Sequence, residues 1–317
     1  MRFAFLLSLF IAFPSSGQIF PVKPIRLVVP FAPGGSSSIV ARSVAAEMEK
    51  TLGQSIVIDN KGGGGGNLAM NEVAHAEPDG YTLIISHVGS MAMTPYLTPN
   101  LGYDVNRDFA AVSLLALVPN IFVVHADVPA KNLREFIALA KAKPGQLYYG
   151  SAGNGSAGHL AMEYLKLLSG MDIQHVPYKG TGPNLIDLVA GRTQITSAGT
   201  PPLMPHVKSG KLRVVAVGTA RRLPSMPDVA TVAEQGFPGF EASQWYGLSA
   251  PAKTPPAIVK RLADDAAKAV KMPSVMQSFA TDDAEGVGST PQDYAAFIAR
   301  EQARWKDVIQ RAKVKAD

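Results

Sequence analysis

The fold is decided by Ile25-Arg26-Leu27-Val28-Val29-Pro30, a short β-rich run that leads directly into the loop Phe31-Ala32-Pro33-Gly34-Gly35-Ser36-Ser37-Ser38. After this loop, Val40, Val44 and Met48 recur every four residues, which predicts an amphipathic helix. A strand, a loop of small residues and a helix in this order are typical of an α/β fold. In such folds ligands bind beyond the carboxyl ends of the strands.

The loop has the chemistry expected of an anion-binding loop. Glycines let the backbone approach a ligand, serines offer hydroxyl groups, and the start of a helix adds unpaired N–H groups and the positive end of its dipole. Taken alone, such a loop is also explained as a tight turn with an N-cap. The residues predicted to contact a ligand here are Phe31, Ala32, Gly34, Gly35, Ser36, Ser37 and Ser38.

A second loop of the same kind follows the predicted strand 147–149 and precedes a helical pattern at Leu160. An overlay of the two strand–loop–helix units aligns Gly35 with Gly155. Two such loops in one α/β chain predict a carboxylate or phosphate site between them. The second set of predicted contacts is Ser151, Ala152, Asn154, Gly155 and Ser156.

Three further features carry weaker predictions. His87 follows the predicted strand 82–86 and is expected to line the cleft, with a structural hydrogen bond as the alternative. Trp245 is a candidate ligand contact or a core residue. The glycines 62–66 lack the Lys-Ser/Thr pair that completes a P-loop, so they are interpreted as a flexible connection with Asn67 as the N-cap of the next helix.

Strand-like and helix-like runs alternate along the chain, which indicates an α/β protein with largely parallel sheets. Other strands are predicted at residues 55–59, 121–124, 174–176 and 212–217, and helices at 133–141, 160–168 and 184–189. Two amphipathic helices, opened by Pro256 and Pro291, predict a C-terminal helical cap without intervening strands.

The chain is expected to cross between two domains near residues 117–120 and to return between residues 218 and 245. This places residues 18–118 and 229–317 in a discontinuous domain 1, and residues 119–228 in domain 2. Residues 1–17 read as an export signal peptide, with cleavage near Gly17.

The composition excludes several classes of protein. The 317 residues contain no Cys, so disulfide frameworks, thiolate nucleophiles and cysteine zinc sites are excluded. The net charge is +5, but no basic run is longer than a pair such as Arg221-Arg222. Because the basic residues are not clustered, no nucleic-acid partner is predicted.

Enzyme and metal signatures are weak. Gly153-x-Gly155-x-x-Gly158 fits the dinucleotide-binding fingerprint, but the acidic partner would be Asp172, which lies in a turn. The chain has no Gly-x-Ser-x-Gly nucleophile motif, and no two of its six histidines are spaced as metal ligands. No catalytic residue, metal or cofactor is therefore predicted, and an exported hydrolase is kept only as a minor alternative.

Several stretches, in order along the chain, resemble the extracytoplasmic receptors of tripartite tricarboxylate transporters, the Bug family. They are residues 23–35, 78–83 (Pro-Asp-Gly-Tyr-Thr-Leu), 149–156 (Tyr-Gly-Ser-Ala-Gly-Asn-Gly-Ser), 175–180 (His-Val-Pro-Tyr-Lys-Gly) and 205–213 (Pro-His-Val-Lys-Ser-Gly-Lys-Leu-Arg). The resemblance implies a type II periplasmic binding protein fold, in which two α/β domains joined by two crossing strands close around a small organic acid. It also implies that the two Gly-rich loops hold one carboxylate.

The resemblance further implies a non-enzymatic, monomeric receptor in the periplasm. Such a receptor captures a mono-, di- or tricarboxylate, including aromatic acids stacked near Phe31 or Trp245, and delivers it to integral membrane permease subunits. Ser38 stands where the family often has Asp, and its neutral side chain favours plain carboxylates over amino acids. A ligand-sensing accessory of a signalling system is the alternative function.

Overall fold

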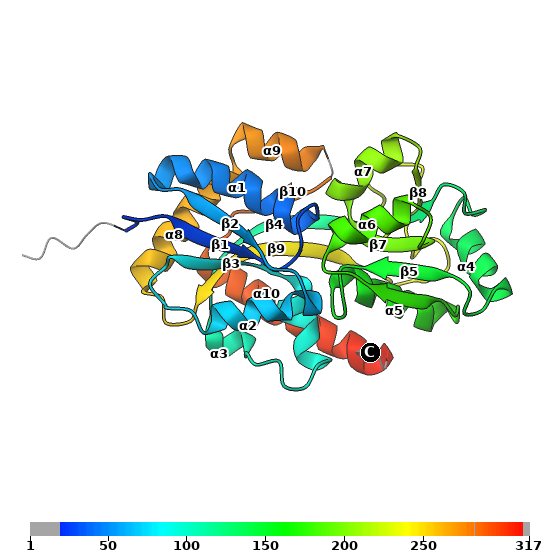
Figure 1. Cartoon of the computed structure of the whole chain (residues 1–317), viewed down its shortest axis with the longest axis horizontal. Coiled ribbons are helices and arrows are strands. Elements are labelled where there is room, and N and C mark those ends of the chain that lie inside the picture. Colours follow the sequence, from blue (N-terminus) through cyan, green and yellow to red (C-terminus); the bar gives the residue numbers. More distant parts are fainter. Residues whose placement is uncertain (1–19, 282, 313–317) are drawn as a thin grey trace, which may run out of the picture.

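The computed structural model describes residues 20–281 and 283–312, which form two lobes side by side (Figure 1). A ten-stranded sheet runs through both lobes. The first lobe contains β2 (Ile56–Asn60), β1 (Ile25–Val29), β3 (Thr82–His87), β9 (Ser243–Pro251), the first part of β4 (Phe109–His125) and β10 (Glu285–Gly286). The second contains β8 (Leu212–Val217), the last part of β4, β7 (Ile195–Gly199), β5 (Tyr148–Ser151) and β6 (Gln174–Pro177).

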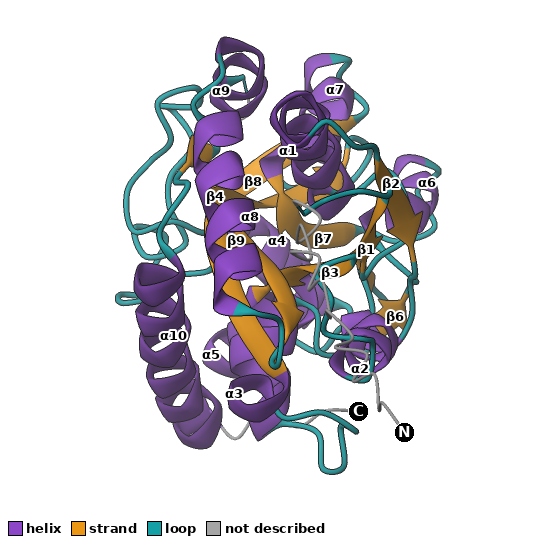
Figure 2. Cartoon of the chain, turned by 90° about the vertical axis from the view of Figure 1, so that its left-hand side faces the viewer, coloured by secondary structure: helices purple, strands orange, loops and turns teal. Residues whose placement is uncertain are grey.

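Helices cover both faces of the sheet in the first lobe (Figure 2). One hydrophobic cluster joins the sheet to α1 (Ser36–Leu52), α8 (Pro256–Val270) and α9 (Pro273–Ala280). A second cluster joins it to α2 (Asn67–Ala74), α3 (Val105–Asp108) and α10 (Pro291–Ala312). Short helical turns η1 (Gly64–Gly66), η2 (Gly89–Met93) and η3 (Thr94–Tyr96) complete this lobe.

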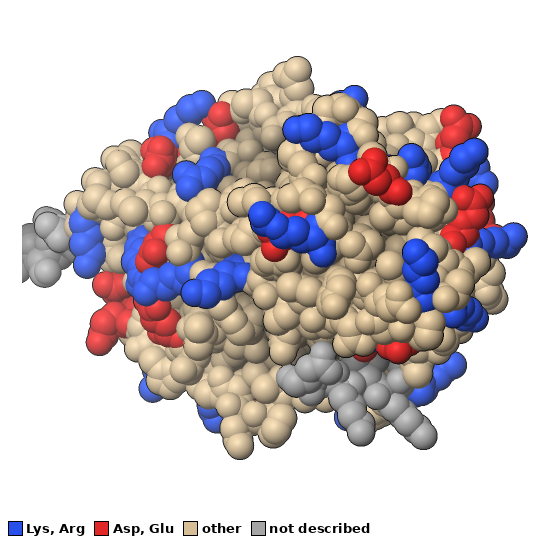
Figure 3. All heavy atoms as spheres, turned by 45° about the vertical axis from the view of Figure 1, so that its right-hand side comes forward, with Lys and Arg blue, Asp and Glu red and all other residues tan. Residues whose placement is uncertain are grey.

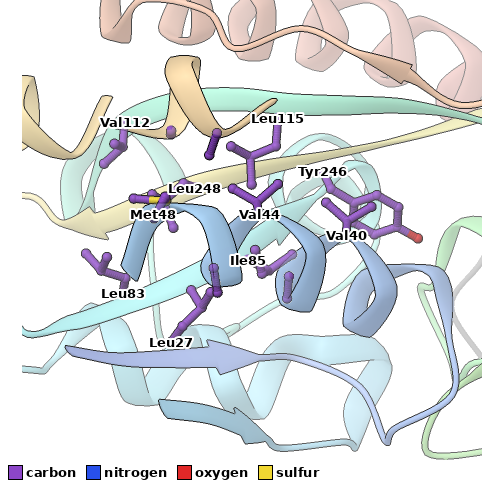
Figure 4. Packing of buried hydrophobic residues seen from close by; sticks show 14 of the residues in the cluster. Leu27, Val40, Val44, Met48, Leu83, Ile85, Val112, Leu115, Tyr246 and Leu248 are labelled. Carbon is purple, nitrogen blue, oxygen red and sulfur yellow. The ribbon is translucent and has the colours of Figure 1, made fainter. Parts of the chain in front are cut away.

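The packing of α1 confirms the helix predicted from residue spacing. Val40, Val44 and Met48 point from α1 toward buried side chains of the sheet, such as Ile85 and Leu115 (Figure 4). These side chains are at most 3% exposed. Burial of this apolar stripe is the main force that fixes α1 behind the Gly/Ser loop.

The second lobe repeats the three-layer arrangement. α4 (Leu133–Ala142) and α5 (Ala157–Ser169) pack in one hydrophobic cluster, and α6 (Thr181–Val189) and α7 (Thr200–Lys208) pack in another. Alternate residues of β4 supply both clusters, with Phe122 in the first and Val123 in the second. Each lobe therefore has hydrophobic packing on both sides of its strands, and Ala157 and Leu160 of α5 also join the cluster of α2, α3 and α10 in the first lobe.

The expectation of largely parallel sheets is wrong. β1 is parallel to β2 and β3, and β5 is parallel to β6 and β7. However, β4 is antiparallel to β7, β8, β9 and β10, and β3 is antiparallel to β9. The long strand that carries the chain between the lobes runs against the βα units, and β10 interrupts the predicted strand-free C-terminal cap.

The passage between the lobes lies in the middle of β4. Pro119 is paired with Ser243 of β9 in the first lobe, whereas Asn120 is paired with Gly199 of β7 in the second. The return path touches the same point, because the N–H of Gly218 donates to the carbonyl oxygen of Asn120 at 2.8 Å. Both connections are thus held together at Asn120.

The division into domains at residues 118 and 228 stays a prediction. Val232, Phe240 and Ala242 pack in the cluster that contains α4 and α5. We therefore propose that the return boundary lies nearer Ala242 than residue 228.

Charges of both signs are mixed on the surface. On the face shown in Figure 3, Lys and Arg side chains alternate with Asp and Glu. Among the described residues, no helix has the length and apolar character needed to cross a bilayer. The predicted export signal lies outside the described residues.

Candidate ligand-binding cleft

A small cavity lies between the lobes, at a point where helices of both lobes begin. Its volume is about 20 Å³. The first residues of α1, α5 and α6 line it; these are Ser36, Ala157 and Thr181. Ala198, two residues before α7, lines it as well. The lining residues are Phe31, Gly35, Ser36, Ser37, His87, Ala152, Ser156, Ala157, Gly158, Thr181, Ser197, Ala198, Gln244 and Tyr246. Converging helix N-termini are suited to hold an anion.

The cavity lining is electrically neutral. Among these described lining residues, none is Asp, Glu, Lys or Arg. Burial lowers the pKa of His87 to about 3, outweighing the opposite effect of the nearby Gly65 carbonyl. The imidazole is therefore uncharged at neutral pH, and an anion here would meet dipoles and hydroxyl groups rather than a cation.

His87 is fixed by its own turn. The N–H of Gly89 donates to Nδ1 of His87 at 3.1 Å, so the ring proton is on Nε2. The Phe31 ring packs beside the imidazole with a centroid distance of 4.7 Å. His87 thus lines the cavity and also has a structural hydrogen bond.

The first loop divides into two parts. Phe31, Gly35, Ser36 and Ser37 line the cavity. Ala32 and Gly34 instead face the second lobe: the N–H of Ala32 donates to the carbonyl oxygen of Lys179 at 2.9 Å. A Cβ on Gly34 would lie 3.4 Å from the Cα of Gly182. The loop therefore serves both as cavity wall and as a contact between the lobes.

Ser38 does not line the cavity. Its Oγ accepts a hydrogen bond of 2.8 Å from Nδ2 of Asn60, which also donates to the Phe31 carbonyl oxygen at 2.9 Å. Ser38 is therefore not placed to select between plain carboxylates and amino acids. The described lining contains no Asp or Glu that could pair with the ammonium group of an amino acid.

The second loop also divides. Ala152 and Ser156 line the cavity, and Ser156 is the N-cap of α5, accepting from the N–H of His159 at 3.4 Å. The carbonyl oxygen of Gly155 accepts a 3.4 Å bond from Oγ1 of Thr94 in the other lobe. Asn154 is likewise turned toward the first lobe.

His159 and His175 make hydrogen bonds to the second loop on the side away from the cavity's first-loop wall. Oγ of Ser151 lies 2.7 Å from Nε2 of His175, and the N–H of Gly155 donates to Nδ1 of His159 at 3.1 Å. The two imidazoles stack with a centroid distance of 4.3 Å, and Tyr149 stacks on His175 at 4.7 Å. Ser151 is therefore a support of the loop and does not line the cavity.

The glycines 62–66 form a contact between the lobes that the sequence did not reveal. A Cβ on Gly62 would lie 2.3 Å from the carbonyl oxygen of Lys179, and one on Gly65 would lie 2.0 Å from that of Asn154. The predicted N-cap is wrong, because α2 is capped by Gly66 and the Asn67 Oδ1 accepts from the Tyr103 hydroxyl at 2.9 Å.

Tyr246, rather than Trp245, reaches the cavity. Trp245 packs edge-to-face on Phe297 at 5.3 Å and donates from Nε1 to Glu301 at 3.0 Å. Consecutive residues of a strand point to opposite faces, so only one of the pair can line the cavity. The lining residues that no local sequence pattern indicated are Ala157, Gly158, Thr181, Ser197, Ala198, Gln244 and Tyr246.

No described group of three or more His, Asp or Glu side chains is placed to hold a metal ion. A sequence profile described as "Tripartite tricarboxylate transporter family receptor" (TctC) matches residues 40–314, most of the chain. The chain belongs to this family. The Bug-family resemblance and the type II periplasmic binding protein fold are confirmed, since solved periplasmic proteins of this type share the fold.

Three relatives of this TctC-family receptor are informative. BugT from Bordetella pertussis (strain Tohama I) is 35% identical over 306 residues, 96% of this chain and 94% of BugT. Rpa4515 of R. palustris, solved with adipate, is 38% identical with a TM-score of 0.89, over 93% of this chain and 99% of its own. MatC (Rpa3494) from Rhodopseudomonas palustris, solved with bound malate, is 37% identical with a TM-score of 0.89, over 92% and 100% of the two chains.

Proposed function

We propose that this receptor captures a small organic carboxylate between its lobes and presents it to the membrane subunits of a tripartite transporter. The observation that carries the proposal is the convergence of three helix starts on one neutral cavity. The ligand class is supported by the relatives solved with adipate and malate. Binding without chemical conversion is the proposed activity.

The carboxylate is proposed to lie between the starts of α1 and α5. There it would accept hydrogen bonds from backbone N–H groups and from the hydroxyls of Ser36, Ser37 and Ser156. Each helix start contributes on the order of 0.3–1 kcal/mol to holding an anion, and up to about 2 kcal/mol when partly buried. The starts of α1, α5 and α6 would together take the place of a cationic side chain.

Loading is proposed to require separation of the lobes. A cavity of about 20 Å³ has room for about one water molecule, far less than a dicarboxylate needs. Separation would break the bond from Ala32 to Lys179 and the bond from Thr94 to Gly155, and the lobes would then close over the ligand. The two crossings, at Asn120 and near Ala242, are the proposed hinge.

We also propose that the protein is exported through cleavage near Gly17 and acts as a monomer in the periplasm. The closed pair of lobes would then be the surface that the integral membrane permease subunits recognise. The family description as a transporter receptor supports this role.

Calorimetry with adipate, malate and succinate tests the proposal, using Gly155→Leu as the disrupting variant. A Cβ at Gly155 would lie 2.9 Å from Oγ1 of Thr94, so a larger side chain should hold the lobes apart and abolish binding. Gly210→Leu is the matched control, because Gly210 has a similar φ of +75° and no neighbour within 4 Å. Equal carboxylate affinity in both variants would refute the assigned site.

A further inference from the structure

A second hollow, the hinge pocket, lies on the opposite face of β9 from the ligand cavity. Its volume is about 340 Å³, within the range of about 300–1,000 Å³ that is typical of ligand pockets. Trp245 lines it, whereas Tyr246 lines the cavity, because consecutive residues of a strand point to opposite faces. The lining consists of residues 117–119 of β4, Thr219, Glu241, residues 243–245 of β9, and five side chains between Asp283 and Arg304.

The hinge pocket borders both crossings between the lobes. Residues 117–119 lie directly before Asn120, and residues 243–245 lie directly after Ala242. Rotation of the lobes about these two strands should widen one side of the hinge as it narrows the other. Closure over the cavity should therefore leave the hinge pocket at its widest, and separation of the lobes should narrow it.

Polar contacts span the hinge pocket. Arg304 of α10 donates to the carbonyl oxygen of Glu241 at 3.3 Å, and its guanidinium lies 3.4 Å from the Glu241 carboxylate. At the rim, Asp283 accepts hydrogen bonds from the N–H and the hydroxyl of Ser225, which follows β8 of the second lobe. Because these contacts join the first lobe to the return path of the chain, the width of the hinge pocket depends on the angle between the lobes.

The hinge pocket is acidic, although the chain as a whole carries a net charge of +5. The carboxylates that line it, beside the guanidinium of Arg304, belong to Glu241, Asp283, Glu285 and Glu301. Glu301 accepts from the indole N–H groups of Trp245 and Trp305. Glu285 is exposed on β10 and forms no ion pair with any residue that the structure describes, so its carboxylate is available to a cation.

An apolar surface lies beside these carboxylates. Trp245 and Phe297 pack edge-to-face with their ring centroids 5.3 Å apart, and Leu117 and Pro119 extend this surface. The combination suits a basic side chain, whose methylene stem covers apolar groups while its charged end reaches a carboxylate. Arginine suits it best, because a planar guanidinium also stacks on aromatic rings and binds a carboxylate through two parallel hydrogen bonds.

On the basis of the transporter function proposed above, we propose that the hinge pocket receives an arginine side chain from an exposed loop of a membrane subunit, and binds it best when the lobes are closed. Coupling between two binding sites is reciprocal. A carboxylate that closes the lobes therefore raises the affinity for arginine, and arginine raises the affinity for the carboxylate. The membrane subunit would thereby distinguish a loaded receptor from an empty one.

Titration with the acetylated tripeptide amide Gly-Arg-Gly tests this, at low ionic strength because salt screens exposed charges. The same peptide with citrulline in place of arginine keeps the side-chain shape without its charge. The indole N–H signal of Trp245 in a nitrogen-15 NMR spectrum, assigned with Trp245→Phe, reports binding in the hinge pocket. The arginine peptide should shift this signal and bind roughly tenfold more tightly than the citrulline peptide. Saturating adipate should tighten the arginine peptide roughly fivefold.

Glu285→Lys is the disrupting variant, because it reverses an exposed charge of the hinge pocket and should weaken the arginine peptide roughly tenfold. Glu77→Lys is the matched control. It makes the same change in net charge at an exposed position outside the hinge pocket, and should bind the peptide like the wild type.

Three results would each overturn the inference. They are equal binding of the arginine and citrulline peptides, equal weakening in Glu285→Lys and Glu77→Lys, and an arginine affinity that does not depend on bound adipate. A wild type that binds no carboxylate would instead refute the proposed function. The two peptides and the two variants, compared without adipate, would then still decide whether the hinge pocket takes a basic side chain.

Discussion

The backbone N–H of Ala32 donates a 2.9 Å hydrogen bond to the carbonyl oxygen of Lys179, which joins the first ligand loop to the residues that precede α6. The two backbones approach this closely because glycines stand around the bond. A Cβ on Gly62 would lie 2.3 Å from the same carbonyl oxygen, and one on Gly182 would lie 2.2 Å from that of Pro33. Contact between the lobes therefore depends on glycine at these positions, because a Cβ there would collide with the facing backbone.

Gly182→Ala should weaken carboxylate binding at least roughly tenfold while leaving the fold intact, because the added methyl group collides with the other lobe only on closure. Calorimetry with adipate and scattering measurements of the radius of gyration check this together. Gly53→Ala is the control: Gly53 has φ +70° and no neighbour within 4 Å, so its substitution should cost stability without affecting affinity. Unchanged affinity in Gly182→Ala would show that this contact does not form in the bound state.

His87 should make the protein sensitive to acid. Its pKa is about 3 in the folded state, against an ordinary value near 6.5, so below pH 6.5 the unfolded chain binds a proton that the folded chain does not. Stability should therefore fall as the pH drops, and this group alone contributes a loss of about 2 kcal/mol between pH 7 and pH 5. Urea unfolding at both pH values, with and without ligand, measures the loss.

His87→Gln should remove most of that loss, although it lowers stability at pH 7 by disturbing the bond from Gly89. The same substitution at the exposed His75 provides the control. If wild type and His87→Gln lose equal stability on acidification, His87 is not buried in its neutral form.

Succinate should bind more tightly than aspartate. The two differ by an ammonium group, and the described lining offers it no carboxylate, so burying it would cost several kcal/mol in typical estimates for real proteins. Calorimetry on this pair measures the difference directly. A clear preference for aspartate would mean that an acidic group enters the site when the lobes close on a ligand.

Trp245→Phe should lower stability by about 1 kcal/mol, because it removes a hydrogen bond to Glu301, but it should not change carboxylate affinity. The neighbouring substitution Tyr246→Phe should behave in the opposite way, with reduced affinity for adipate and retained ring packing. Parallel melting curves and titrations separate the two effects. Loss of affinity in Trp245→Phe would restore this side chain as a ligand contact.

The parts of the site that sequence could predict are those encoded locally. A strand, a Gly/Ser loop and a helix are contiguous, so order and residue type alone pointed to Gly35, Ser36, Ser37 and Ser156, which the structure places in the cavity lining. The direction of neighbouring side chains was less predictable. Ser38 follows Ser37 directly, yet it turns to Asn60, since successive residues of a helix start lie about 100° apart around the axis.

The cavity residues contributed by β9 were not predictable in this way. Gln244 and Tyr246 meet Ser36 only after the chain has passed through the second lobe and returned, and both faces of β9 carry bulky side chains. β7 was also missed, because Ile-Thr-Ser-Ala-Gly at 195–199 has little β-branched or aromatic content. The role of the glycines 62–66 depends on the backbone of Lys179 and Asn154, and no local pattern encodes that contact.

The neutral lining of the cavity has a consequence for how cargo leaves. A receptor that binds its anion through an arginine side chain must break an ion pair at each release and leave the guanidinium group to be rehydrated. In the site proposed for this receptor, water would occupy the same N–H and hydroxyl groups when the lobes separate, so release of the ligand would leave no unpaired charge on the protein. Under the proposed function, retention would then depend on how long the lobes stay closed, and a membrane partner would need only to separate them to release the ligand.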